Sequence, residues 1–479
     1  MSTENIIFTG VALYMLGMLG VGFYASRRAH TVADFMVAGR GLSLPVCSMT
    51  VMATWFGGAM MLGGAGAAFD SGMLGVIADP WGGALALLLV GLFFARVFRR
   101  LRIITVTDFM EQRFGKVAGA GITITTVFSN VMWVAGMLVA FGAIFQVLTN
   151  IPVETGIIIG AVIVFVYTMV GGMWAVALTD FFQMTIIIFG LVVLLVVGLV
   201  AVGGWGHIAP SLPSGTFNML PPENTAEQWL NYLRAWTIIG LVDISAQTLF
   251  QRASAAKTEK IAQQAFYIGG AGYLLFGMIP VFLGIIGSVT MPDIANPEYI
   301  IPELAQQHLH PVMIAIFVGA MLAAIMSSAD SALLGASSVL SRNVLPFFKR
   351  DPSPKLTLLV ARLGVPLFGL VAILIALRIQ VVFDLMVDAN ILGLAAIIVP
   401  FILGVYWSKA NRTGALSGMG AGLAVWLITM QLWPSLPADF MGLGASLVVM
   451  VIVSMLTQAF DPPRQLADSD GNPVSAGPG

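Results

Sequence analysis

The sequence predicts an all-α polytopic membrane protein with about thirteen transmembrane helices. Three observations support this prediction. The 479 residues are 58% hydrophobic and only 9% charged, whereas soluble globular proteins carry about 25% charged residues. Apolar runs long enough to cross a bilayer recur along the chain. The basic residues gather in alternate connecting loops.

A bilayer core requires about 20 apolar residues in helical form. The first run lacks a preceding basic stretch and is too long for a cleavable signal, so it is interpreted as a true span. A single transmembrane domain is therefore expected over residues 1–459. The polar, Pro- and Gly-rich segment 460–479 is expected to be a disordered cytoplasmic tail. The expected spans are 6–25, 43–66, 74–98, 119–147, 153–171, 180–203, 229–250, 264–290, 311–340, 357–377, 381–407, 414–432 and 437–459.

Charge placement supports this division. Loops that face the cytoplasm are enriched in Lys and Arg, and one alternate set of loops holds all basic residues except Arg234 and Arg378. The opposite loops, such as 204–227 and 291–310, hold none. The N-terminus is therefore expected outside and the C-terminus in the cytoplasm, in a cell membrane and specifically a bacterial inner membrane. The basic set comprises Arg27, Arg28, Arg40, Arg96, Arg99, Arg100, Arg102, Arg113, Lys116, Arg252, Lys257, Lys260, Arg342, Lys349, Arg350, Lys355, Arg362, Lys409, Arg412 and Arg464.

Glycine pairs interrupt the second predicted span. Gly57-Gly58 and Gly63-Gly64 stand in an otherwise apolar segment, and glycine is a poor helix former. Backbone carbonyls freed at that depth can bind a cation if they line a wet cavity. Close packing of helices is the alternative, and the segment alone leaves both interpretations open.

The ninth predicted span carries a polar face. Ala324, Ser327, Ser328 and Ser331 are spaced by three and four residues, so they share one side of a helix. Asp330 lies in the same turn, where an unpartnered carboxylate is costly within a membrane. Hydroxyl, carbonyl and carboxylate oxygens suit a hard cation. A small-residue helix interface, with serines bonded back to the preceding turn, is the alternative.

Other polar and aromatic residues lie within spans. Asp180 opens the sixth span and is either a helix N-cap or an ion ligand. Asp243 lies within the seventh span beside Ser245 and Gln247, which favours a site-lining role. Trp55 adjoins the glycine break, where an indole face can attract an organic cation; core packing is the alternative. Asp384 and Asp388 are explained by solvation near the outer face.

Absent motifs narrow the function. The sequence has no phosphate-binding loop, no metalloprotease motif and no Cys/His cluster, and its one cysteine, Cys47, permits no intrachain disulfide. An ATP-driven pump and an enzyme are therefore not expected. Transport driven by an ion gradient, a passive pore and a transporter-like sensor remain, and the short tail argues against an attached signalling domain.

Several segments resemble the sodium:solute symporter family, whose members include proline, pantothenate, glucose and choline carriers. The resemblance covers about residues 5 to 458. Its motifs are ADFMVAGRGLS (33–43), ATWFGG (53–58), VGGMWAVALTDFFQ (170–183), LFQR (249–252), MSSADSALLGASSVLSRNV (326–344) and GVYWSKANRTGALSG (404–418).

The resemblance implies a LeuT-type fold with two inverted repeats of five helices, at about 43–203 and 229–407. The broken second span and the polar seventh span then fall at corresponding first positions of the repeats, where such carriers bind substrate. The resemblance also implies a sodium site and, as in some members, a second one. The main site would use Ala53, Phe56, Ala324, Ser327 and Ser328; the second would use Asp180, Asp330 and Ser331.

The motifs are most similar to those of the choline-transporter branch, which holds trimethylammonium in an aromatic cage. Trp55 and Trp133 match two cage positions. Ala246 and Gly83 stand where that branch has a tryptophan and a tyrosine, which weakens the cage. Asp243 offers a compensating negative charge. The expected substrate-binding residues are Trp55, Gly57, Trp133, Asp243 and Gln247.

The resulting expectation is a sodium-coupled symporter that imports a small polar organic solute, such as a quaternary-ammonium or other organic cation. The alternatives are a symporter for a small carboxylate or amino acid, and an uncoupled uniporter or channel. Na⁺ is the expected coupling ion, a monomer is the expected functional unit, and no nucleic-acid partner is expected.

Overall fold

The computed structural model describes residues 3–149, 151–379, 390–391, 393–433 and 435–474. Within these residues the chain is almost entirely helical and forms no β-sheet. Nine helices in the described part are long and apolar enough to cross a membrane. The all-α membrane fold is therefore confirmed, whereas the count of thirteen spans is not.

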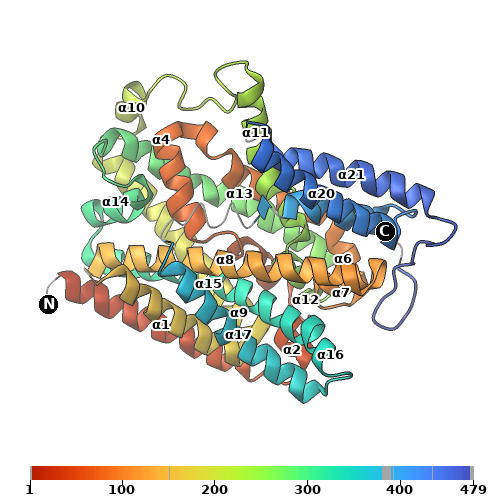
Figure 1. The fold of residues 1–479 in the computed structure, drawn as a ribbon. Coiled ribbons are helices and arrows are strands. Elements are labelled where there is room, and N and C mark those ends of the chain that lie inside the picture. The colour runs from red at the N-terminus through yellow and green to blue at the C-terminus, as the bar shows by residue number, and fades with distance from the viewer. Residues whose placement is uncertain (1–2, 150, 380–389, 392, 434, 475–479) are drawn as a thin grey trace.

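Figure 1 shows the helices packed into one bundle, with a long loop between α10 and α11. Their bounds are α1 (Thr3–Ser26), α2 (Val32–Val37), α3 (Leu44–Ala53), α4 (Ala65–Gly75), α5 (Gly83–Leu89), α6 (Ala95–Leu101), α7 (Val106–Phe114), α8 (Lys116–Thr149), α9 (Val153–Ala201), α10 (Trp205–Ile208), α11 (Ala226–Gly240), α12 (Gln247–Ala255), α13 (Glu259–Thr290), α14 (Ile300–His308), α15 (Pro311–Val339), α16 (Leu345–Phe348), α17 (Pro354–Ala376), α19 (Ile398–Tyr406), α20 (Arg412–Leu432) and α21 (Ala438–Leu456).

Two of the expected spans are broken helices. The second span consists of α3, an irregular stretch from Thr54, the π-helical segment η2 (Ala59–Gly64), and α4. The seventh span consists of α11, the 3₁₀ segment η6 (Val242–Ser245), and α12. Each break leaves backbone groups outside regular helical bonding, which a membrane protein tolerates only where protein or a polar cavity satisfies them.

The expected fifth and sixth spans are continuous with each other as α9. At about 1.5 Å per residue, a straight helix of 49 residues would be more than twice as long as a bilayer core is thick. Gly172 interrupts the helical geometry with φ 54°, a conformation that glycine adopts without steric cost. A Cβ here would lie 2.4 Å from the Phe35 carbonyl oxygen. Part of the eleventh expected span lies outside the described residues. Asp384 and Asp388 belong to that part.

The polar ninth span forms the centre of the molecule. Most residues of α15 are buried, and it packs against α1, α8, α9 and α17. By contrast, α20 and α21 pack mainly against each other and are largely exposed; Figure 1 shows this pair at one side of the bundle. The serines of α15 therefore lie in the protein interior.

The C-terminal segment, expected to be disordered, makes defined contacts as far as it is described. Asp470 pairs with Arg102 at 3.0 Å, and Gln112 donates to the Ala467 carbonyl at 2.7 Å. Leu466 is buried. Composition suggested a free tail, but these few anchoring contacts hold it against α6 and α7.

Candidate functional site

The break after α3 places backbone carbonyls against α15. The Ser328 hydroxyl lies 3.4 Å from the carbonyl oxygens of both Ala53 and Thr54. These distances are long for O–H···O hydrogen bonds, which usually span 2.5–3.0 Å. The neighbouring Ser327 hydroxyl is buried, lies beside the Asp180 carboxylate and makes no hydrogen bond of normal geometry. Hydroxyl and carbonyl oxygens thus gather here without tight mutual bonding, as a hard-cation site requires.

The other residues expected at this site are also buried. Phe56 lies within the break, and Ala324 lies one helical turn before Ser328. Both would contribute carbonyl oxygens. The structure therefore brings the expected main-site residues to the junction of α3, η2 and α15.

The glycines of the break serve close packing at the same place. A Cβ at Gly57 would lie 2.5 Å from Ser328 Oγ, and one at Gly58 would lie 2.7 Å from Ala140 Cβ on α8. The two interpretations of these glycines are thus compatible, because tight packing brings the broken backbone to the Ser328 hydroxyl.

A buried charge cluster lies beside this junction. The Arg252 guanidinium is fully buried, lies 3.7 Å from Asp180 Oδ2 and donates to Ser331 Oγ. Asp180 also accepts a hydrogen bond from Thr50. Asp330 accepts hydrogen bonds from Tyr167 at 2.5 Å and from Ser331 at 3.1 Å. Two carboxylates and one guanidinium therefore share the interior between α9, α12 and α15.

Two sequence interpretations need correction here. The charge pattern places Arg252 in a basic loop, but the residue lies within α12. There it pairs with Asp180, since a buried cation requires a partner. Asp180 lies inside α9, whose N-cap is Pro152, so its N-cap interpretation is wrong. Spacing could not reveal this pair because its members are distant in sequence.

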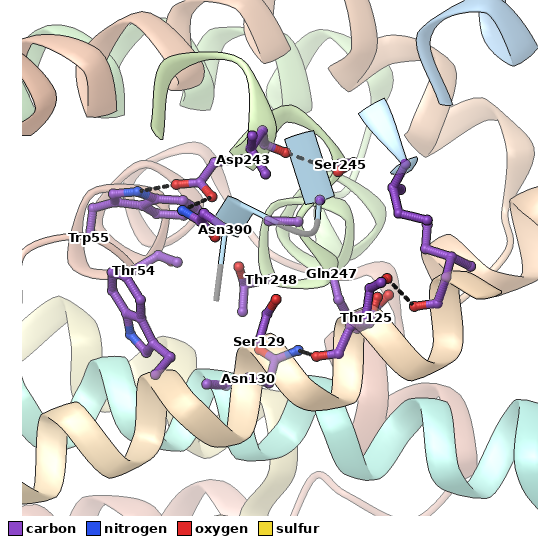
Figure 2. A pocket seen from close by; sticks show the side chains of 18 of the residues that line it. Thr54, Trp55, Thr125, Ser129, Asn130, Asp243, Ser245, Gln247, Thr248 and Asn390 are labelled. Carbon is purple, nitrogen blue, oxygen red and sulfur yellow. Dashed lines mark hydrogen bonds between the residues drawn. The ribbon is translucent and has the colours of Figure 1, made fainter. Parts of the chain in front are cut away.

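A cavity of about 90 Å³ adjoins the broken helices. Figure 2 shows Trp55, Asp243 and Asn390 together on one side, facing Thr125, Ser129 and Asn130 of α8. The further lining residues are Thr54, Ile122, Thr126, Trp133, Val242, Ser245, Ala246, Gln247, Thr248, Ser328, Ala332, Gly393 and Ile397. Ser328 thus borders both the cavity and the carbonyls of the break.

Asp243 is the one carboxylate among the described lining residues. Trp55 Nε1 donates to Asp243 Oδ2 at 2.9 Å, and Asn390 Nδ2 donates to Oδ1 at 3.3 Å. Trp133 and Gln247 also line the cavity, as expected, although the Gln247 amide is bonded to the backbone of Ile104 and Val106. Gly57, also expected there, instead faces Ser328 and Met137.

Sequence reasoning missed a second carboxylate, the half-buried Asp79, which accepts a hydrogen bond from Tyr273. Tyr273 Oη also lies 3.5 Å from the Trp55 carbonyl oxygen. A Cβ at Gly83 would lie 2.9 Å from the Tyr273 ring and 3.1 Å from Asp79 Oδ1. Tyr273 and Asp79 therefore occupy the space beside Gly83. The available signal was an aspartate at the start of an apolar span.

Comparison with known proteins places this geometry in context. The sodium:solute symporter family model matches residues 35–422. The high-affinity choline transporter 1 of Homo sapiens is 32% identical over 436 residues, covering 86% of this chain and 74% of the transporter. The osmoregulated proline transporter OpuE of Bacillus subtilis is 29% identical over 497 residues, covering 96% of each protein.

Solved structures agree on the fold. A Na⁺-coupled sialic acid symporter in an outward-open state superposes with a TM-score of 0.83 at 20% identity, covering 96% of this chain and 99% of that one. The nucleobase-cation-symport transporter Mhp1 gives 0.64 at 16% identity, covering 89% and 95%. The family model matches most of the chain, and the two broken helices agree with it. This chain therefore belongs to the sodium:solute symporter family, and is a transporter rather than an enzyme.

Proposed function

We propose that this symporter couples the inward movement of Na⁺ to the uptake of a small organic cation. The observation that carries the proposal is the approach of the Ser328 hydroxyl to the Ala53 and Thr54 carbonyls, on the wall of the cavity that contains Asp243. Sodium would bind to the carbonyls of Ala53, Phe56 and Ala324 and to the hydroxyls of Ser327 and Ser328. Choline and proline are the solutes named for the relatives.

This location explains coupling. The broken helix and α15 are separate elements, and the Ser328 hydroxyl of α15 approaches the carbonyls of the break at this point. A bound ion would hold them together and fix Trp55, which follows Thr54 directly, in the cavity wall. Ion and solute would then each raise the affinity of the other, as linkage requires.

A second cation is proposed at the cluster of Asp180, Asp330 and Ser331. Two carboxylates and the Arg252 guanidinium leave one negative charge uncompensated when both acids are ionised. Asp180 Oδ1 and Ser327 Oγ, which belong to neighbouring side chains, make no hydrogen bond of normal geometry. These oxygens are available to an ion. Asp180→Asn should reduce the number of sodium ions moved per solute from two to one; an unchanged ratio would remove this site.

The proposed orientation places the N-terminus outside the cell membrane and the basic loops in the cytoplasm. Gly206→Cys and Lys349→Cys test it, because both positions are exposed and lie on opposite sets of loops, while the native Cys47 is buried. A membrane-impermeant maleimide should label the cysteine at 206 in intact cells and the cysteine at 349 only after lysis. The reverse pattern would invert the topology.

Uptake into proteoliposomes tests the transport proposal. Radiolabelled ethanolamine, choline and proline would be supplied separately, with an inward sodium gradient or with equal sodium on both sides. We expect a cation to accumulate above equilibrium only with the gradient. Equal uptake in both conditions would indicate an uncoupled uniporter, and accumulation of proline alone would support the amino-acid alternative.

Charge favours a cation over a carboxylate as the solute. Among the described lining residues of the cavity, none is Lys, Arg or His, while Asp243 contributes a carboxylate. An anionic solute would meet this charge without a cationic partner, at a substantial electrostatic cost in a low-dielectric interior.

A further inference from the structure

The cavity wall carries several side chains that can accept a hydrogen bond. Asp243, Asn130 and Asn390 carry carboxylate or amide oxygens, and Thr54 and Thr248 add hydroxyls. A ligand N–H group can donate to any of these oxygens, whereas a methyl group on nitrogen cannot. The lining therefore distinguishes cations by the hydrogen atoms on their charged nitrogen.

The aromatic surface is too small for a cage. Quaternary ammonium ions are bound through several aromatic faces, and the described lining holds two indoles, Trp55 and Trp133. The Trp55 indole is held in place by the hydrogen bond that its Nε1–H donates to the Asp243 carboxylate. At Gly83 a larger side chain would collide with Tyr273 and Asp79, and Ala246 contributes only a methyl group.

A second carboxylate lines a neighbouring cavity. Trp133 and Asn390 line both the main cavity and a smaller one of about 30 Å³, and Asp79 lines the smaller one. None of the ion pairs formed among the described residues includes Asp79 or Asp243. A cation that crosses the Trp133–Asn390 boundary therefore passes from one uncompensated acid to another.

We infer that this symporter selects a protonated amine with N–H donors, in preference to a fully methylated quaternary ammonium. The ammonium group lies at Asp243 and donates to its carboxylate and to a neighbouring amide oxygen. This inference rests on the proposed cation transport and names the chemical class of the cation.

A matched ligand series tests it. Ethanolamine, N-methylethanolamine, N,N-dimethylethanolamine and choline share one skeleton and one positive charge but carry three, two, one and no N–H donors. Their dissociation constants would be measured by calorimetry on the purified full-length protein, in sodium and in potassium buffer. A hydrogen bond to a charged group contributes enough to change affinity about tenfold. We expect choline to bind at least about tenfold more weakly than ethanolamine.

Two variants test whether Asp243 causes the preference for ethanolamine over choline. Asp243→Asn should weaken ethanolamine binding strongly and reduce the difference between ethanolamine and choline. Asp70→Asn removes an equal charge from an exposed position on α4 and should leave the ranking unchanged.

The outcomes separate this inference from sodium coupling. Tighter binding of choline than ethanolamine, or no binding by any member of the series, would overturn the inference. The expected ranking in both buffers, with equal affinities, would support the inference and overturn sodium coupling. The expected ranking with tighter binding in sodium supports both.

Discussion

Gly57 offers a direct test of the proposed sodium site, because its missing side chain leaves room for the Ser328 hydroxyl. In Gly57→Ala the new Cβ would lie 2.5 Å from Ser328 Oγ, 3.0 Å from Ser328 Cβ and 3.1 Å from Met137 Sδ. Favourable contacts between such atoms require about 3.5 Å or more. Ser328 or the broken backbone must therefore shift by up to about 1 Å, which disturbs the approach of the Ser328 hydroxyl to the carbonyls of the break.

The size of the effect follows from overpacking, which costs about 1–3 kcal/mol in a well-packed interior. The φ angle of Gly57 is not positive, so alanine adds no left-handed backbone strain. If the cost falls on the ion-bound form, sodium affinity should decrease by roughly tenfold to a hundredfold, since 1.4 kcal/mol corresponds to a factor of ten.

The assay is the sodium midpoint for thermal stabilisation of purified protein, with potassium replacing sodium at constant ionic strength. A bound ion stabilises the folded state by RT ln(1 + [Na⁺]/Kd), so the sodium concentration at which stability begins to rise reports the sodium affinity. Gly58→Ala is the matched control, because its Cβ would meet Ala140 on α8 at 2.7 Å. It should lower thermal stability while changing the sodium midpoint much less.

Gly420→Ala provides a second control, since no atom lies within 4 Å of its added Cβ. An unchanged sodium midpoint in Gly57→Ala, with normal folding, would refute the placement of sodium beside Ser328. Equal shifts in Gly57→Ala and Gly58→Ala would indicate a general packing defect instead.

Ser327→Ala combined with Ser328→Ala should raise the sodium requirement for uptake at least tenfold, and an unchanged requirement would remove these hydroxyls from the site. Arg252→Met should lower the unfolding free energy by about 3–5 kcal/mol because it leaves buried carboxylates unpaired; Arg27→Met, at an exposed position, should change it by less than about 0.5 kcal/mol. Burial and nearby Asp108 raise the pKa of Glu111 on α7. Ionisation of Glu111 therefore costs stability as pH rises through its folded-state pKa. Glu111→Gln should remove that loss in denaturation curves measured across this pH range, and an unchanged pH profile would contradict the prediction.

The sequence was informative where local pattern determines structure. Glycine pairs predicted the break at Gly57, and helical spacing placed Ser327 and Ser328 on one face. Both features depend on neighbours within a few residues. The polar cluster around Asp243 likewise predicted a site-lining role, and Asp243, Ser245 and Gln247 do line the cavity; the break of this span at η6 was not predicted.

Pairing between distant elements could not be predicted in the same way. Arg252 follows an apolar run and precedes two lysines, so it looked like a loop residue until the fold brought Asp180 beside it. The role of Gly83 was visible only after Tyr273 and Asp79 were found to occupy its missing side-chain volume. Side-chain volumes and charges meet through tertiary packing, which sequence spacing does not encode.

Reciprocal flux is the most direct test of sodium coupling. Proteoliposomes would contain equal sodium on both sides, with tracer ²²Na⁺ outside, and an inward gradient of the solute that binds most tightly in sodium. Coupling predicts that ²²Na⁺ accumulates inside above equilibrium while the solute gradient lasts, and that Ser327→Ala with Ser328→Ala abolishes this accumulation. Solute entry without net sodium movement would contradict the account.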